Sequence, residues 1–207
     1  MKRIIARALA PLLLCGCVPD VGPPASLLVG PRVLAVRSEP AEVAPGEATR
    51  LTLYVAGPEP ELAALVTDAS WALCRSGTPP ADNNFVTERC LQDESAVTAV
   101  AARGAQVEVQ VPADACAVFG PQTPPVPPGQ PPGRPRDPDA TGGYYQPVRV
   151  LVPMLGLAAV AGIRIVCGLP HATPESAAAY RMQYVRNRNP QVDGLALFGE
   201  GGEIFAD

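Results

Sequence analysis

The stretch Ala69-Ser-Trp-Ala-Leu-Cys-Arg75 places Trp71 and Leu73 on one face and contains neither proline nor glycine. Because successive residues of a strand point to opposite sides of a sheet, this pattern predicts a strand with Trp71 in the core. Trp71 is the only tryptophan in the 207 residues. Outward from it, six further runs alternate in the same way and are bounded by Pro, Gly or Asp. They are 32–38, 48–56, 96–102, 106–112, 144–152 and 162–168.

The segments between these runs predict turns. Ala44-Pro-Gly-Glu47 suits a type II turn, since proline fixes its own φ and glycine takes a positive φ. Arg103-Gly-Ala105 predicts a hairpin that joins 96–102 to 106–112. The uncharged run from Val150 to Ile163 is too short to span a membrane, and we expect two strands that meet at a turn within it.

Seven short strands with this spacing favour two packed sheets. The arrangement resembles immunoglobulin-like domains, which carry a buried tryptophan on the third strand. Their usual disulfide between the second and sixth strands is absent, because 48–56 and 144–152 hold no cysteine. We therefore expect an all-β, Ig-like or fibronectin-like, seven-stranded antiparallel sandwich with a proline-rich loop insertion and a C-terminal extension. Another all-β core built around Trp71 is the alternative.

The first residues have the order of an export signal: a basic start, an apolar run over 4–14, and Leu14-Cys-Gly-Cys17. This motif resembles the lipobox of bacterial lipoproteins. The resemblance implies that Cys17 becomes the lipid-carrying N-terminus and that the partner there is the membrane. Val18, rather than aspartate, follows the cysteine, which in that family implies the outer membrane, on its periplasmic face or at the cell surface.

A second resemblance covers most of the remaining chain. Four segments are similar to those of uncharacterised Ig-like lipoproteins from GC-rich Gram-negative bacteria: 31–40, Val43-Ala-Pro-Gly46, Trp71-Ala-Leu-Cys74 and Asn187-Arg-Asn-Pro190. The resemblance implies a location in the cell envelope and supplies no activity.

The expected organisation has four parts. Residues 1–16 are the lipoprotein signal peptide and 17–31 a tether. Residues 32–170 form the sandwich, which includes a proline-rich loop over 120–139. Residues 171–207 are a C-terminal extension or the start of a second, incomplete domain.

Charge narrows the range of partners. Loss of Lys2, Arg3 and Arg7 with the signal changes the formal net charge from −4 to −7. An acidic chain without a basic cluster is a poor nucleic-acid binder. We therefore expect no nucleic-acid partner.

Four cysteines remain after the signal: Cys74, Cys90, Cys116 and Cys167. An even number in an exported chain predicts disulfides, and the chain has no Cys-x-x-Cys pair and one histidine, so we expect no zinc site. Of three possible pairings, strand directions favour 74 with 90 and 116 with 167, although all four lie near one end of the sandwich.

Catalytic patterns are sparse. His171 is the single candidate imidazole base, and no nucleophile motif accompanies it. Asp93 with Glu94, and Asp137 with Asp139, lack the ligand spacing of a calcium loop. We expect no catalytic residue, no metal and no cofactor.

Chain direction predicts where recognition occurs. Alternating strands place the ends of the first, third, fifth and seventh at one pole, away from the lipid. The proline-rich loop and the tail after Gly168 gather there, and Pro124, Pro135, Tyr180 and Tyr184 are the expected contacts. Residues 180–185 alternate as a strand would, although Thr173-Pro174 could begin a helical turn.

The function expected from the sequence is a non-catalytic, lipid-anchored binding or structural module with a protein or polysaccharide partner in the envelope. One alternative is a carbohydrate-binding or adhesion module that uses tyrosines. A cell-wall hydrolytic enzyme is the other.

Overall fold

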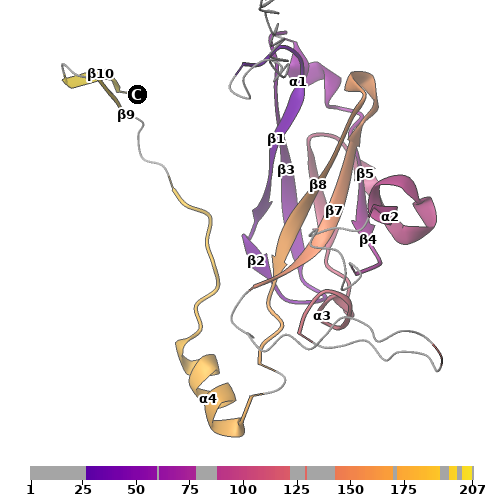
Figure 1. Cartoon of the computed structure of the whole chain (residues 1–207), viewed down its shortest axis with the longest axis vertical. Helices are drawn as coiled ribbons and strands as arrows, with labels where there is room; N and C mark the ends of the chain where they lie inside the picture. The colour runs from indigo at the N-terminus through magenta and orange to yellow at the C-terminus, as the bar shows by residue number, and fades with distance from the viewer. Residues whose placement is uncertain are drawn as a thin grey trace, which may run out of the picture.

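The computed structural model describes residues 27–59, 61–77, 88–121, 129, 143–169, 172–191, 196–199 and 202–206. Within them the chain is mostly β and forms two packed sheets and a separate hairpin (Figure 1). The three-stranded sheet has the order β1 (Arg32–Glu39), β3 (Ala48–Ala56), β6 (Gln106–Gln110). The five-stranded sheet has the order β2 (Glu42–Val43), β8 (Leu157–Ile165), β7 (Tyr144–Val152), β4 (Ser70–Cys74), β5 (Val97–Arg103). The hairpin pairs β9 (Ala196–Gly199) with β10 (Gly202–Ala206).

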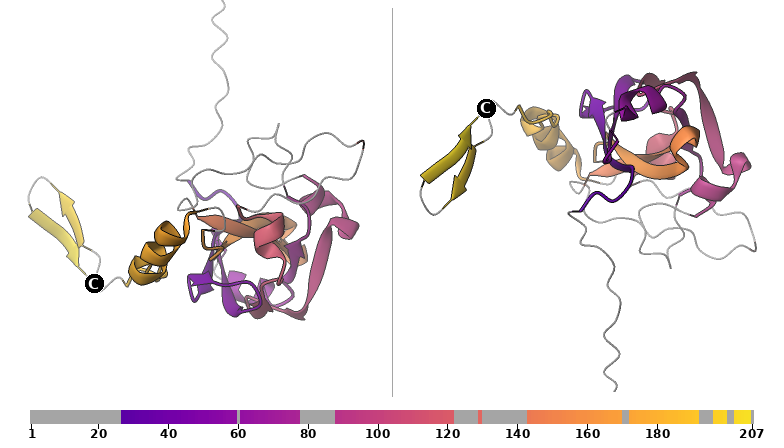
Figure 2. Two further views of the ribbon diagram at one scale, coloured as in Figure 1. Left: turned by 90° about the horizontal axis from the view of Figure 1, so that it is seen from below. Right: turned by 90° about the horizontal axis from the view of Figure 1, so that it is seen from above.

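Short helices connect the strands, and Figure 2 shows the two sheets from both ends of the molecule. The connecting elements are α1 (Leu62–Leu65), α2 (Arg89–Gln92), η1 (Glu94–Ala96), α3 (Ala115–Val118), η2 (Pro153–Leu155) and α4 (Pro174–Gln183). No helix of the described residues is long and apolar enough to cross a membrane.

The core lies between the sheets and is centred on Trp71, as the sequence predicts. Trp71 is 2% exposed, and its indole Nε1 donates a hydrogen bond of 2.9 Å to the Gly104 carbonyl oxygen. Leu51 and Leu53 of β3 face it from the opposite sheet. Buried polar groups must find partners, so this hydrogen bond lets an indole occupy the centre of an apolar core.

The expected hairpin across residues 103–105 is wrong. β5 pairs with β4, whereas β6 pairs with β3, so the tight turn crosses from one sheet to the other. The two sides of the turn are held by different sheets: Gly104 N–H donates to the Ala69 carbonyl, and the Ala105 carbonyl accepts from Leu53 N–H, both at 2.8 Å. Alternation in a sequence predicts strands but does not specify which neighbour each one pairs with.

The strands differ most from the expected ones at β8 and at an additional short strand. β8 begins at Leu157 rather than at residue 162, because the chain turns over Pro153–Leu155 and reverses at Gly156, whose φ is +61°. Glu42–Val43 adds a two-residue strand that the sequence pattern does not reveal, and it pairs in parallel with the end of β8. The two sheets therefore hold eight strands in the described residues.

The two disulfides are those expected from strand direction. Cys74 joins Cys90 and Cys116 joins Cys167, with Cα–Cα distances of 5.5 and 5.4 Å. Cys74 and Cys90 pack with Ala72 and Val97 in a small cluster outside the main core. Cys74 therefore faces away from Trp71, as the spacing of three residues requires.

The outer face of the five-stranded sheet also carries a buried cation. Arg149 of β7 has a side chain that is 5% exposed, and its Nη2 donates to both carboxylate oxygens of Glu94 at 2.8 Å. This pair connects the 88–96 segment to the sheet, next to the Cys74–Cys90 bridge.

The predicted strand over residues 180–185 is also wrong. Residues 174–183 form α4, with Pro174 at its first turn and the Thr173 hydroxyl accepting from Ser176 N–H at 3.3 Å. The N-terminal cap and three consecutive alanines outweigh the short alternation of Tyr180, Met182 and Tyr184. None of the residues of α4 is buried.

Four strands end at the same pole of the sandwich. β1 and β6 are both antiparallel to β3, and β4 and β8 are both antiparallel to β7. The ends of β6 and β8 are joined by Cys116–Cys167, and β2, which follows β1, pairs with the end of β8. We call this end, which is the lower one in Figure 1, the disulfide pole. The common end of these strands was predicted from alternating chain direction.

Candidate functional site

A C-terminal segment, residues 184–190, is fastened along the disulfide pole, and we call it the strap. Its main attachment is Glu42 of β2, whose side chain is 2% exposed. The carboxylate accepts from Arg164 Nε of β8 at 3.2 Å, from Asn187 N–H at 2.7 Å and from the Tyr184 hydroxyl. The buried Glu42 carboxylate thus connects β8 to the strap, because it bonds to Arg164 on β8 and to Tyr184 and Asn187 of the strap.

The ionisation of Glu42 is set by two opposing effects. Burial raises the pKa of its carboxyl, whereas the hydrogen bonds from Asn187, Tyr184 and Arg164 lower it, and the net pKa is below the ordinary value of 4.5. Burial, with the neighbouring carboxylate, raises the pKa of the Tyr184 hydroxyl. At neutral pH the site therefore holds a charged carboxylate and a neutral phenol donor.

Two further contacts position the strap. Arg186 Nη1 lies 2.7 Å from Glu47 Oε2, and both side chains are nearly half exposed. Asn189 Nδ2 donates to the Ser38 carbonyl and to Glu39 Oε2, each at 2.6 Å. The Ser38 contact places the strap against the outer edge of β1.

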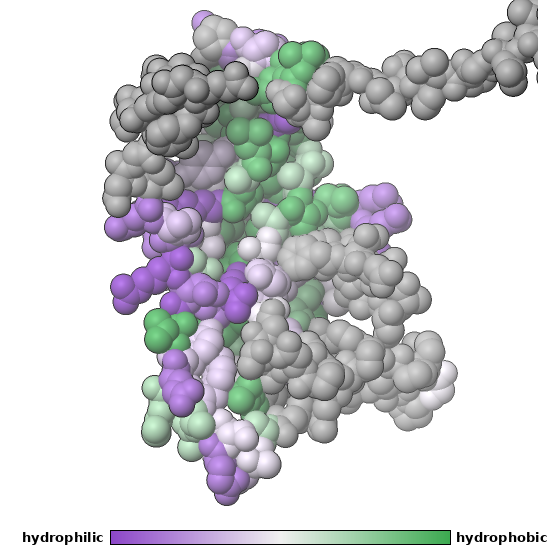
Figure 3. All heavy atoms as spheres, turned by 60° about the vertical axis from the view of Figure 1, so that its left-hand side comes forward, coloured by the Kyte–Doolittle hydropathy of each residue, from purple (hydrophilic) through white to green (hydrophobic). Residues whose placement is uncertain are grey.

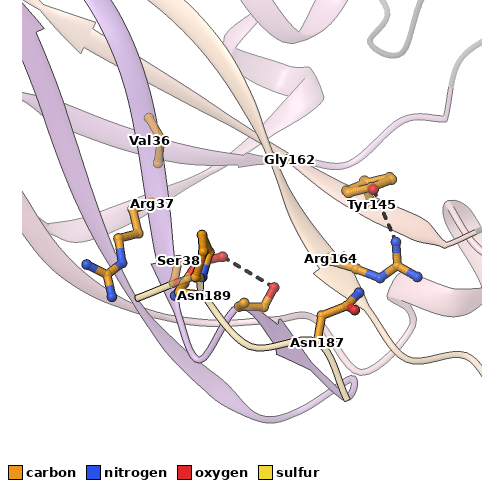
Figure 4. A pocket seen from close by; sticks show the side chains of 10 residues that line it. Val36, Arg37, Ser38, Tyr145, Gly162, Arg164, Asn187 and Asn189 are labelled. Carbon is orange, nitrogen blue, oxygen red and sulfur yellow. Dashed lines mark hydrogen bonds between the residues drawn. The ribbon is translucent and has the colours of Figure 1, made fainter. Parts of the chain in front are cut away.

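A groove of about 500 Å³ lies between β1, β8 and the strap (Figure 4). This volume is within the range of roughly 300–1,000 Å³ found for ligand pockets. β1 supplies one wall, β7 and β8 the other, and the strap borders the groove at the disulfide pole. Its lining residues are Val36, Arg37, Ser38, Ala41, Tyr145, Gly162, Arg164, Asn187, Asn189 and Pro190.

The groove is polar on the side of β8. Arg164 Nη1 donates to the Tyr145 hydroxyl at 3.3 Å, and its guanidinium carbon lies 5.9 Å from the centre of the Tyr145 ring (Figure 4). Gly143 permits this placement, because a Cβ at that position would collide with the guanidinium. Tyr145 is 37% exposed, and its side chain lines the groove.

The surface on this side of the molecule is mixed. In the space-filling view, hydrophilic side chains gather beside a band of hydrophobic ones (Figure 3). Leu34 of β1 is 59% exposed and Val185 of the strap 76%. Exposed apolar side chains therefore occur on β1 and on the strap, the two segments that border the groove.

The structure places the residues predicted for binding in different situations. Tyr180 and Tyr184 stack with ring centroids 4.6 Å apart, and the Tyr184 hydroxyl is bound to Glu42, so Tyr184 holds the strap in place. Pro124 and Pro135 lie outside the described residues. Cys17 lies outside them as well.

The tyrosines form no row on which a sugar could stack. Tyr144 is 9% exposed and faces the core, whereas its neighbour Tyr145 points outward at the groove. Tyr180 and Tyr184 are only partly exposed.

Catalytic and metal-binding arrangements are sparse in the described part of the chain. Groups of three or more His, Cys, Asp or Glu that could hold a metal ion do not occur among the described residues. His171 lies outside the described part of the chain.

Sequence reasoning missed the groove and most of the residues that form it. Glu42 is an isolated acid in a turn region, and its burial depends on a strap more than 140 residues away in the sequence. The sequence motif that could have pointed to the site is Asn187-Arg-Asn-Pro190, to which sequence analysis assigned no function. In the structure Asn187 and Asn189 attach the strap to Glu42 and to Ser38.

Comparison of the chain with protein-family models, with curated proteins and with solved structures gives no match.

Proposed function

We propose that this chain is a non-catalytic, lipid-anchored protein of the outer membrane that acts as a binding or structural module in the cell envelope. Its recognition surface is the disulfide pole with the adjoining groove. The observation that carries the proposal is the common direction of β1, β4, β6 and β8, whose ends gather the strap and the groove at one pole. The start of β1, to which any N-terminal tether connects, lies at the opposite end.

The sandwich is, on this proposal, of the immunoglobulin-like class. Three features support it: the strand order β1-β3-β6 against β2-β8-β7-β4-β5, the parallel pairing of β2 with β8, and the buried Trp71 on β4. β1 and β2, which follow each other in the chain, pair with different sheets, β1 with β3 and β2 with β8. Because proteins of this class have many functions, the proposed recognition surface rests on the groove and not on the fold.

A carbohydrate-binding or adhesion role remains the second candidate, because Tyr145 presents an exposed ring beside a polar groove. The burial of Tyr144 and the engagement of Tyr184 count against an extended stacking platform. A cell-wall hydrolytic enzyme is a weaker candidate, since it would need an acid, base or nucleophile in the groove, and Arg37, Ser38 and Arg164 do not make one.

The anchoring part of the proposal is tested by Cys17→Ser, with Cys15→Ser as the matched control. The proposal requires Cys17→Ser to abolish lipid attachment and to leave the chain soluble or unprocessed. Cys15→Ser should fractionate with membranes as the wild type does. Normal processing and membrane fractionation of Cys17→Ser would end the lipid-anchor proposal.

A further inference from the structure

Among the residues that the structure describes, nothing pairs with part of the edge of β8 that borders the groove. Val166 N–H donates to the Val43 carbonyl at 2.9 Å, so the even-numbered residues at this end of β8 point their backbone groups toward β2 and the odd-numbered ones toward β7. Gly162 and Pro147 of β7 therefore form a non-hydrogen-bonded pair, a position where β7 can hold a proline without losing a bond to β8. The Gly162 N–H and C=O are directed away from β7, toward the groove.

β2 is too short to cover this edge. It pairs only with Arg164 and Ile165, and β8 continues for seven residues before them. By the alternation of the ladder, Val160 also directs its N–H and C=O to the open side. Within the described residues, no hydrogen bond is formed by the backbone of Val160 or Gly162 on that side.

The opposite wall of the groove is a second open edge. Leu53 N–H bonds to Ala105, so the odd-numbered residues of β3 face β6 and its even-numbered residues face β1. Arg37 pairs with Thr52, which leaves the N–H and C=O of Val36 and Ser38 directed outward. The contact of Asn189 with the Ser38 carbonyl confirms this direction and shows that the edge accepts a hydrogen-bonding partner.

We propose that the groove binds an extended polypeptide segment of a partner, which adds to the edge of β8 in line with β2. The segment would hydrogen-bond to the backbone of Gly162 and Val160, with Val36 of β1 on its other side. Side chains of β8 point to the two faces of the sheet, so the backbone groups of Gly162 and Val160 at its edge stay accessible to an incoming strand. This mode of recognition takes its affinity from main-chain hydrogen bonds and its selectivity from alternate side chains.

The occupant is a single extended chain rather than a folded partner or a second copy. The two open edges belong to different sheets and form opposite walls of one groove, so a partner that reaches the edge of β8 has to pass β1. β1 and the strap would obstruct the edge strand of a second sandwich. This inference rests on the proposed recognition surface, and it adds the class of ligand.

The test uses a library of random twelve-residue peptides displayed on phage and selected on the immobilised full chain. An enriched peptide is synthesised in its ordinary form and with N-methyl groups on alternate amides. Strand addition requires that N-methylation on one set of alternate amides lower the affinity at least tenfold and that methylation on the other set have little effect. Equal affinity of both methylated forms, or a failure to enrich any peptide, would overturn the proposal.

Gly162→Pro removes the outward N–H without touching the ladder to β7, and Gly162→Ala is its matched control. Peptide affinity should fall at least tenfold in Gly162→Pro and stay within about twofold in Gly162→Ala, with urea unfolding used to verify that both variants fold. If the proline variant does not fold, hydrogen exchange of the wild-type chain replaces it: the bound peptide should protect the amides of Val160 and Gly162. Unchanged peptide affinity in a folded Gly162→Pro, or unprotected amides at 160 and 162, would refute strand addition. Membrane anchoring is measured separately, so failure here leaves the anchoring proposal standing.

Discussion

Glu42→Gln is the substitution that probes the attachment of the strap most sharply. Glu42 Oε1 accepts from Arg164 and Tyr184, and Oε2 accepts from Asn187 N–H. A glutamine has one oxygen and one NH₂ group. Whichever way its amide is oriented, a donor then faces a donor, at least one hydrogen bond is lost, and the Arg164 guanidinium loses its counter-charge.

The size of the effect follows from burial. Hydrogen bonds to charged groups contribute about 1.5–3 kcal/mol each, and removing one partner of a buried ion pair costs roughly 3–5 kcal/mol. The Arg164 side chain is 24% exposed, so water recovers part of this cost. We expect Glu42→Gln to lower the free energy of unfolding by about 2–4 kcal/mol. For a chain of this size that corresponds to roughly 5–15 °C in Tm.

The assay is urea unfolding at neutral pH, with Glu47→Gln as the matched control. Glu47 contacts the same strap through Arg186, but both side chains are nearly half exposed, and such pairs contribute less than about 1 kcal/mol. If Glu42→Gln and Glu47→Gln differ by less than about 0.5 kcal/mol, the buried carboxylate does not hold the strap.

Three other predictions follow from the structure. The difference in unfolding free energy between wild type and Glu42→Gln should be at its full size above pH 4.5, the ordinary pKa of a glutamate. It should shrink as the pH falls through the lowered pKa of Glu42, in a series of urea unfolding curves. A difference that is unchanged at about pH 2 would contradict an ionised carboxylate at this site. Replacing Cys74 and Cys90 together by serine should cost on the order of 2–4 kcal/mol of unfolding free energy, and an unchanged urea midpoint would show that the bridge does not form. Trp71→Phe loses the hydrogen bond to Gly104 and part of the core volume; calorimetry should record a loss of about 2–4 kcal/mol, and a loss below about 1 kcal/mol would be inconsistent with a buried indole.

The sandwich could be predicted because its signals are local. Trp71 on an alternating run, proline and glycine at the turns, and cysteines at strand ends are all visible in the sequence. The pairing of strands is not local. The turn at Gly104 has the sequence of a hairpin, yet it connects two sheets. The Gly104 carbonyl accepts a hydrogen bond from Trp71 of the five-stranded sheet, whereas the Ala105 carbonyl accepts one from Leu53 of the three-stranded sheet.

The candidate site depended almost wholly on long-range contacts. Glu42 and Asn187 meet across 145 positions, and no periodicity in either segment indicates that they do. The sequence predicted Tyr184 at the recognition surface, and Tyr184 does lie at the disulfide pole. Its hydroxyl, however, donates a hydrogen bond to Glu42 and so attaches the strap to the sandwich. The open edge at Gly162 becomes visible only when the short pairing of β2 with β8 is known.

The central claim, that partners are recognised at the disulfide pole, is tested most directly by site-specific photo-crosslinking in intact cells. A photoreactive residue replaces Tyr145, which borders the groove, or Met154, which is 66% exposed in the turn at the other end of the same pair of strands. The account predicts partner adducts from position 145 and none from position 154. Adducts from position 154 alone, equal adducts from both, or none from either would contradict it.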